Sequence, residues 1–259
     1  MKKILFASLL VAFGSGSAFA ADMAARMPVK AAPMIAPVSS WQGFYVGGNI
    51  GYGWGNGRAS NSSLTQGAVT FLDPSTLNTD PDGVIGGGQI GYNWQMGSLV
   101  TGLEVDIQGS GIKGSNTKAP FTAGGVPTVG SSLSFNERIS WFGTVRGRLG
   151  FTATPSLLLY ATGGLAYGEV KDSANVHFAA SGDFPASVSK TKAGWTAGAG
   201  GEWMFAPNWS AKIEYLYVDL GNQSASVSTA AVIGFGATPI NYDWKNQDHI
   251  VRAGVNYHF

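Results

Sequence analysis

The regular alternation of apolar with small or polar residues is the strongest pattern in this chain. In the segment that begins at Gly43, Phe44, Val46 and Ile50 share one parity, whereas Gly47 and other small or polar residues occupy the other parity. A period of two is typical of β-strands whose two faces meet different surroundings. The pattern therefore predicts an all-β chain.

Eight segments follow this pattern, and the connections between them alternate in length. The predicted strands cover residues 43–54, 84–96, 99–108, 136–152, 156–168, 191–205, 209–220 and 248–259. Short turns at 97–98, 153–155 and 206–208 alternate with long connections at 55–83, 109–135, 169–190 and 221–247. Short turns on one rim and long loops on the other are typical of bacterial outer-membrane barrels. We therefore predict an eight-stranded antiparallel transmembrane up-and-down β-barrel, with three short periplasmic turns and four long extracellular loops.

The positions of the charged residues distinguish this membrane barrel from a soluble β-sandwich, in whose strands apolar and polar residues would also alternate. A sandwich exposes its polar face to water, whereas a lipid-facing Arg or Lys at the bilayer midplane costs about 2–4 kcal/mol. The apolar parity carries no Lys, Arg, Asp or Glu through the middle of any predicted strand. The charges predicted to line the lumen lie on the other parity: Glu104, Asp106, Arg138, Arg146, Arg148, Glu202, Lys212, Glu214 and Arg252.

These inward charges nearly balance, because four acids face five bases. Eight strands enclose only enough room for side chains to pack, so the composition favours an ionic plug over a wide pore. The pairs expected from each residue's distance to the turn that its two strands share are Glu202–Lys212, Glu104–Arg146 and Glu214–Arg252.

Outward aromatic residues gather near the predicted strand ends, where the interfacial girdles of membrane barrels lie. They are Trp54, Tyr92, Trp94, Phe151, Tyr167, Trp203, Phe205, Trp209, Tyr217, Tyr257 and Phe259. The fifth predicted strand is apolar on both parities, and we assign Leu157, Leu159, Leu165 and Tyr167 to its outward face.

The first forty residues do not follow the strand pattern. Lys2 and Lys3 precede an apolar stretch at 4–13, and Ala18 and Ala20 form a small-residue cleavage site, so residues 1–20 are predicted to be a secretory signal peptide. Residues 21–40 are rich in Ala and Pro and indicate a flexible periplasmic lead-in. The barrel domain is predicted to cover residues 41–259.

Composition excludes several other classes of protein. Lys and Arg number 16 against 15 Asp and Glu, so cleavage after Ala20 removes two bases and leaves a net charge of about −1, which does not favour nucleic-acid binding. The chain has no Cys, so it has no disulfide framework and no thiolate metal site. Its 38 Gly suit a barrel interior in which side chains approach the opposite wall closely.

Several sequence motifs of the predicted barrel domain, taken together, resemble those of one protein family. The segments WQGFYVGGNIGY from Trp41, GQIGYNWQ from Gly88, GTVRGRLG from Gly143 and LYATGGLAYG from Leu159 resemble the small alphaproteobacterial outer-membrane β-barrel proteins of the opacity/porin-like type. The resemblance covers about 41–259. The C-terminal residues Arg252, Gly254, Tyr257 and Phe259 resemble the signal by which outer-membrane proteins are recognised for assembly.

The resemblance implies a location in the outer membrane. The expected partners are outer-membrane lipid and lipopolysaccharide, the secretion and barrel-assembly machinery, and a possible extracellular ligand or host surface. The resemblance favours a role in envelope integrity and surface interaction. A narrow porin-like diffusion channel and a surface protein that binds haemin or another ligand stay open as alternatives.

We expect no enzymatic activity, cofactor or metal. The glycine-rich segment 51–55 lacks the following helix of a nucleotide loop. A hydrolase-like site could be drawn from His177, Asp172 or Asp183 and a loop serine as nucleophile, but a surface histidine is the better interpretation. Apolar residues in the predicted loops are interpreted as anchors that hold the loops together, with ligand contact as the alternative: Phe71, Leu72, Phe121, Phe178, Phe184 and Phe235.

Overall fold

The computed structural model describes residues 40–66, 68–179, 182–228 and 239–259, all of which belong to one compact unit, Val38–Phe259. The predicted signal peptide with Ala18 and Ala20, and the lead-in up to residue 39, lie outside the described residues. In the described residues, no helix is sufficiently long and apolar to cross a membrane.

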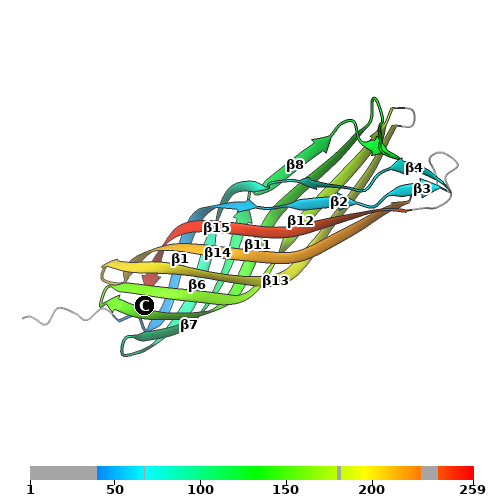
Figure 1. Cartoon of the computed structure of the whole chain (residues 1–259). Coiled ribbons are helices and arrows are strands. Elements are labelled where there is room, and N and C mark those ends of the chain that lie inside the picture. The colour runs from blue at the N-terminus through cyan, green and yellow to red at the C-terminus, as the bar shows by residue number, and fades with distance from the viewer. Residues whose placement is uncertain (1–39, 67, 180–181, 229–238) are drawn as a thin grey trace, which may run out of the picture. The chain divides into compact units, whose positions relative to one another are not determined.

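Eight long strands form a closed antiparallel barrel (Figure 1). They are β1 (Gly43–Gly55), β6 (Asp82–Met96), β7 (Leu99–Ser110), β11 (Ser132–Thr154), β12 (Leu157–Phe178), β13 (Gly182–Ala206), β14 (Trp209–Ser228) and β15 (Pro239–His258). Each strand pairs with the next in this order, and β1 also pairs with β15, which closes the ring. The predicted fold class is confirmed.

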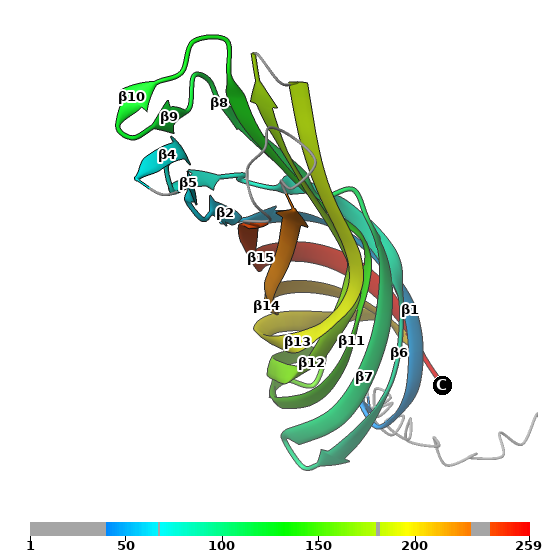
Figure 2. The same ribbon diagram turned by 90° about the vertical axis from the view of Figure 1, so that its right-hand side faces the viewer.

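Short strands fill the first two long connections and prolong the barrel wall on the side away from the short turns (Figure 2). The connection after β1 contains β2 (Arg58–Asn61), β3 (Leu64–Gln66), β4 (Val69–Leu72) and β5 (Ser75–Asn78). The connection after β7 contains β8 (Lys113–Lys118), β9 (Thr122–Ala123) and β10 (Val126–Pro127). Because β2 pairs with β15 and β5, and β8 pairs with β11 and β6, these three strands continue the barrel sheet. The other four form two separate hairpins, β3 with β4 and β9 with β10.

Strands β12 to β15 extend much further than the sequence pattern indicated, whereas β1, β6 and β7 match it to within two residues. The fifth and sixth strands were predicted to end at Gly168 and to begin at Thr191, but β12 ends at Phe178 and β13 begins at Gly182. The outward residues of this extension are polar, as Lys171 and Ser173 illustrate. An outward apolar pattern cannot reveal such strands, because beyond the membrane the outer face meets water.

A β-bulge at Ser140 reverses the inward parity of β11. Register with β12 shifts between Ile139 and Trp141, and an extra residue in one strand turns the following side chains to the other face. On the side of the bulge away from the short turns, Glu137 and Ile139 are buried inside the barrel, whereas Arg138 is exposed on its outer face. The predictions that Arg138 faces the lumen and that Ile139 faces outward are therefore wrong.

An apolar band covers the outer face of the barrel. Exposed outward residues include Phe44, Ile50, Ile90, Leu103 and Ile213. Several of the predicted girdle residues, all exposed, lie on this face: Trp54, Trp94, Phe151, Trp203, Phe205, Trp209 and Phe259. In the strand that is apolar on both parities, the predicted orientation is confirmed, because Leu159 and Leu165 are exposed while Leu158 is buried.

Three apolar clusters lie inside the barrel at different heights. The turn-end layer lies near the short turns and comprises Trp41, Val100, Leu158, Tyr160 and Met204. The middle layer comprises Ile85, Ile112, Ile139, Phe142, Ala166, Val170, Leu216, Val218, Leu220 and Ile250. The loop-end core comprises Ala59, Leu64, Leu72, Leu77, Phe121, Leu133, Phe135, Ala174, Val176, Ala186, Ile240, Tyr242 and Trp244.

The predicted loop anchors have that role wherever the structure describes them. Leu72 and Phe121 belong to the loop-end core, and Phe71 and Phe178 pack against it. Phe184 packs edge-on against Phe178, with ring centroids 5.8 Å apart. Phe235 lies outside the described residues.

Candidate functional site

A charged layer crosses the barrel between the turn-end layer and the middle layer. Its residues come from β7, β11, β13, β14 and β15, where the period of two turns alternate side chains inward. Eight of the nine predicted residues are buried here: Glu104, Asp106, Arg146, Arg148, Glu202, Lys212, Glu214 and Arg252. Arg138 does not join them, so four acids face four bases in this layer.

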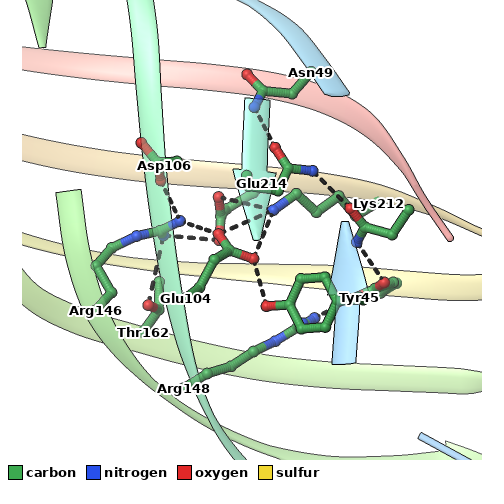
Figure 3. A network of polar contacts seen from close by, with 12 residues as sticks. Tyr45, Asn49, Glu104, Asp106, Arg146, Arg148, Thr162, Lys212 and Glu214 are labelled. Atoms are coloured by element: carbon green, nitrogen blue, oxygen red, sulfur yellow. Dashed lines mark hydrogen bonds and ion pairs between the residues drawn. The ribbon is translucent and has the colours of Figure 1, made fainter. Parts of the chain in front are cut away.

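Arg146 contacts three of the four acids of the layer (Figure 3). Its guanidinium lies 3.0 Å from Asp106 Oδ2 and 3.0 Å from Glu214 Oε1, and it also forms an ion pair with Glu104. Its Nε donates a hydrogen bond of 2.9 Å to Thr144 Oγ1. Because every charged nitrogen has an acceptor, a fully buried guanidinium is tolerated here.

Ion pairs connect strands on opposite sides of the ring. Lys212 on β14 lies 3.0 Å from Glu104 on β7, the strand four places away around the barrel. Arg252 on β15 lies 2.6 Å from Glu214 on the adjacent strand and 3.1 Å from Asp106 on β7. The charged side chains therefore extend across the lumen and do not only line its wall.

A second cluster lies towards the short turns, around Glu202. Arg148 forms an ion pair with this carboxylate and stacks on the Tyr160 ring at 3.6 Å from the ring centroid. Ser210 Oγ and Asn256 Nδ2 donate hydrogen bonds of 2.5 and 2.7 Å to Glu202 Oε1. Arg148 thus gains a cation–π contact in addition to its ion pair.

The three expected pairs stand directly opposite each other in the sheet, but only two of them form ion pairs. Arg146 pairs with Glu104, and Arg252 pairs with Glu214. Glu202 stands opposite Lys212 in the register, yet Lys212 reaches across to Glu104 while Glu202 contacts Arg148. The expected Glu202–Lys212 ion pair is wrong, because in a narrow lumen a long side chain reaches strands beyond its neighbour.

Neutral residues that the sequence interpretation missed complete the layer. Tyr45 Oη donates a hydrogen bond of 2.7 Å to Glu104 Oε2, and an added Cβ on Gly91 would collide with the Tyr45 ring. Trp41 is fully buried at the short-turn end, where its Nε1 donates a 3.2 Å hydrogen bond to the Pro155 carbonyl. The inward parity of Tyr45 could have indicated its place, whereas Trp41 precedes the first strand and has no parity.

Ser210, His258 and Glu202 lie together but lack the geometry of a catalytic triad. Ser210 Oγ lies 2.9 Å from His258 Nε2, and Glu202 Oε1 lies 3.3 Å from the same nitrogen. In a triad the acid instead orients the histidine through its other ring nitrogen. His258 Nδ1 is buried and has no hydrogen-bond partner among the described residues.

The other candidate sites are also separated or structural. His177 lies 3.0 Å from Asp183 on the exposed hairpin, whereas Asp172 is buried inside the barrel. Segment 51–55 is the end of strand β1. Over the ranges that the structure describes, no group of three or more His, Asp and Glu side chains is placed to hold a metal ion.

Comparison with known proteins identifies the family to which this barrel belongs. The family described as "Outer membrane protein beta-barrel domain" matches residues 6–259. The chain belongs to this family. The "31 kDa outer-membrane immunogenic protein" of Brucella melitensis biotype 1 is 41% identical over 263 residues, with 100% of each chain covered. The "22 kDa outer membrane protein" of Rhizobium leguminosarum bv. viciae is 34% identical over 236 residues, which cover 91% of this chain and 83% of the relative.

The predicted location in the outer membrane and the resemblance to alphaproteobacterial outer-membrane proteins are thereby confirmed. Among solved structures, the crystal structure of the outer membrane protein OprG from Pseudomonas aeruginosa shares 11% sequence identity with a TM-score of 0.46, and the match covers 84% of this chain and 97% of that chain.

In an outer-membrane barrel of this family, the short turns face the periplasm and the long hairpins face the outside of the cell. The predicted assembly-signal residues lie on β15 and at its end. Arg252 points into the charged layer, whereas Phe259 is exposed on the outer face, where its backbone N–H donates a 2.9 Å hydrogen bond to the Phe44 carbonyl. Gly254 stands opposite Lys212.

Three further carboxyl groups are buried inside the barrel, on the loop side of the charged layer: those of Glu137, Asp172 and Asp248. Glu137 and Asp172 stand opposite each other on β11 and β12, farther from the short turns than Trp141 and Tyr167. Burial raises the pKa of Glu137 to about 7, although Thr79 Oγ1 donates a 2.8 Å hydrogen bond to it. Burial and, to a smaller extent, the nearby Glu137 raise the pKa of Asp172 to about 8.

Proposed function

We propose that this protein is a structural barrel of the outer membrane that supports envelope integrity. Its extracellular hairpins make contacts at the cell surface, and its lumen does not act as a diffusion channel. The observation that carries the proposal is the set of ion pairs across the lumen, above all Lys212 with Glu104 and Arg252 with Asp106. A solute would have to break these buried pairs, and a buried charge that loses its partner is costly.

The apolar layers support the same proposal. The turn-end layer and the middle layer lie on the two sides of the charged layer, and a hydrated ion gains nothing from apolar walls. Water-filled general porins are built from about sixteen strands, twice the number in this ring. The arrangement of Ser210, His258 and Glu202, which lacks the geometry of a catalytic triad, supports a structural role over catalysis.

The extracellular hairpins are suited to contacts at the cell surface. The loop-end core holds the connections together through buried residues such as Phe121, Phe135 and Trp244. A packed core presents its outer residues in a fixed arrangement, which favours recognition by a partner. Relatives described as outer-membrane immunogenic proteins support exposure of this region at the cell surface.

A deletion strain tests the proposed role. Cells that lack the protein should become more sensitive to detergent and should release periplasmic enzyme, while uptake of small hydrophilic solutes stays unchanged. Expression of the wild-type chain should restore resistance. Unchanged detergent resistance combined with slower solute uptake would contradict the proposal and favour the diffusion channel.

A further inference from the structure

A polar cavity of about 640 Å³ lies in the barrel wall where β8 runs between β6 and β11, and charged residues of both signs line it. Asp82 on β6 stands directly opposite Lys113 on β8, and Lys113 stands directly opposite Arg138 on β11. Opposite residues of an antiparallel pair point to the same face, so an acid and two bases follow one another over three strands that Figure 1 labels. Asp80 adds a second acid to the lining.

The four charged side chains of this cavity, Asp80, Asp82, Lys113 and Arg138, do not neutralise one another. All four are exposed, and none of them takes part in an ion pair within the described residues. Charges of unlike sign on opposite residues attract each other, yet Asp82 accepts a hydrogen bond from the Tyr52 hydroxyl and not from Lys113. Two acids and two bases are therefore free to pair with a ligand that carries both signs.

The backbone around the cavity holds its acidic side in place. The Thr79 N–H donates a 2.9 Å hydrogen bond to the Gly57 carbonyl, and the Gly55 N–H donates a 2.7 Å hydrogen bond to the Pro81 carbonyl. Gly114 on β8 packs so closely against this segment that an added Cβ would lie 2.3 Å from the Thr79 carbonyl oxygen. A site that is already formed loses less entropy when a ligand binds.

The innermost lining residue is Glu137, and it lacks one hydrogen bond. Thr79 Oγ1 donates a 2.8 Å hydrogen bond to Glu137 Oε2, whereas Glu137 Oε1 is buried and has no hydrogen-bond partner in the part of the chain that the structure describes. A third carboxyl group makes the inner end of the cavity favourable for a cation. The neutral lining residues Ser115 and Asn136 can exchange hydrogen bonds with an amide group.

The spacing of the charges indicates the size of the ligand. Neighbouring strands lie about 4.8 Å apart, so Asp82 and Arg138, on the two sides of β8, stand about 10 Å apart. An extended dipeptide is about 7 Å long, and flexible side chains at each end cover the remaining distance. The volume of the cavity also lies within the range of about 300–1,000 Å³ that is typical of small-molecule sites.

We propose that this cavity binds a zwitterionic dipeptide, whose ammonium group pairs with Asp80 and Asp82 and whose carboxylate pairs with Lys113 and Arg138. The Arg138 guanidinium donates two parallel hydrogen bonds to the carboxylate, and Lys113 contributes a point charge. This binding site goes beyond the proposed structural role. Because it lies in the wall and not in the lumen, it does not depend on whether the barrel conducts.

Calorimetric titration of the purified, folded protein in non-ionic micelles tests the proposal, with glycyl-glutamine as the probe. The wild type should bind this dipeptide at least about fivefold more tightly than N-acetyl-glycyl-glutamine, which lacks the ammonium group, and than glycyl-glutamine amide, which lacks the carboxylate. Equal affinity for the three compounds, or no measurable binding of the dipeptide at millimolar concentration, would overturn the proposal.

Two double variants assign each end of the dipeptide to its side of the cavity. Asp80→Asn with Asp82→Asn should remove the preference over the N-acetyl compound and keep the preference over the amide. Lys113→Gln with Arg138→Gln should have the reverse effect. The heat-modifiable band on gels shows that each variant is folded. Loss of both preferences in each folded variant would contradict the assigned contacts.

A third double variant controls for general charge attraction. Asp183→Asn with Lys190→Gln removes one acid and one base from exposed positions on β13. It should change the affinity for glycyl-glutamine less than about twofold. A loss as large as that in the cavity variants would overturn the assigned site.

Discussion

Arg146 connects more partners of the charged layer than a simple ion pair would. It contacts Asp106, Glu104 and Glu214, which lie on two different strands. Its removal leaves three carboxylates in a dry interior with fewer cations, and such uncompensated burial is strongly destabilising.

We expect Arg146→Met, which keeps the side-chain volume, to lower the free energy of unfolding by about 3–5 kcal/mol. Urea titration of the barrel in lipid vesicles measures this change. Arg138→Met is the matched control, because Arg138 is exposed and outward, and its change should stay within about 0.5 kcal/mol. Equal effects of the two substitutions would contradict the buried-layer account.

Asp172 should make the barrel less stable as the pH rises. Its ordinary pKa of 3.8 is raised to about 8 by burial, so between these values the unfolded chain loses its proton before the folded chain does. The unfolded form is then favoured increasingly with pH, until the pH passes about 8 and both forms are ionised. Glu137 acts in the same direction up to about pH 7.

The variant Asp172→Asn removes this titration while keeping a similar shape. At pH 8 it should raise the free energy of unfolding by at least about 2 kcal/mol relative to the wild type, and at pH 4 it should have little effect. Parallel urea titrations at the two pH values check this. A stability gain of the same size at both pH values would rule out ionisation as its cause.

Single residues also show what a sequence pattern can and cannot predict. The inward position of Glu104 or Arg252 follows from the period of two, because that period is imposed by the backbone. The partner of Lys212 does not follow, because it depends on how far a flexible side chain reaches across a narrow lumen. Trp41 could not be placed at all, since it lies before the first strand.

At the scale of the elements, the bulge at Ser140 controls the orientation of the upper part of β11. Below it β11 pairs with β7, and above it β11 pairs with β8. The bulge thus lies where the strand changes its neighbour. Because Ser140 is an extra residue, Glu137 and Arg138 take the faces opposite to those that unbroken alternation along the numbered chain predicts.

We expect the barrel to tolerate deletion of Ser140, because Ser140 is the extra residue of the bulge. Without it, regular alternation still directs Glu137 inward and Arg138 outward. Limited proteolysis should cut the extracellular hairpins no faster than in the wild type, with the heat-modifiable barrel still present on gels. Deletion of Val145, which lies in a regular part of the strand, is the matched control and should disrupt the barrel, because it turns the buried Thr144 to the outer face. Faster cleavage of the Ser140 deletion variant than of the wild type would contradict the assigned role of the bulge.

Strand number and strand order could be predicted from the sequence, but strand length could not. Alternation between apolar and polar residues exists only where lipid meets the outer face. Beyond Tyr167 the outward residues of β12 are polar, so the pattern stops although the hydrogen-bonded strand continues to Phe178. A bulge such as that at Ser140 has no fixed sequence signature, and its parity change therefore escaped the pattern.

At the scale of the whole molecule, charged and apolar layers follow one another along the lumen. The turn-end layer, the charged layer, the middle layer and the loop-end core each draw residues from several strands. Closure at several heights means that no single substitution should open the barrel. The charged layer can hold four acids and four bases because these side chains form ion pairs with one another.

Solute permeation through the purified wild-type barrel tests the closed lumen most directly. We expect no disaccharide entry in liposome-swelling assays and no steady single-channel current in planar bilayers, because ion pairs such as Lys212 with Glu104 cross the lumen. A known general porin, reconstituted at the same protein-to-lipid ratio, provides the positive control. Disaccharide entry at a porin-like rate, or a sustained current with a defined unitary size, would contradict the closed barrel.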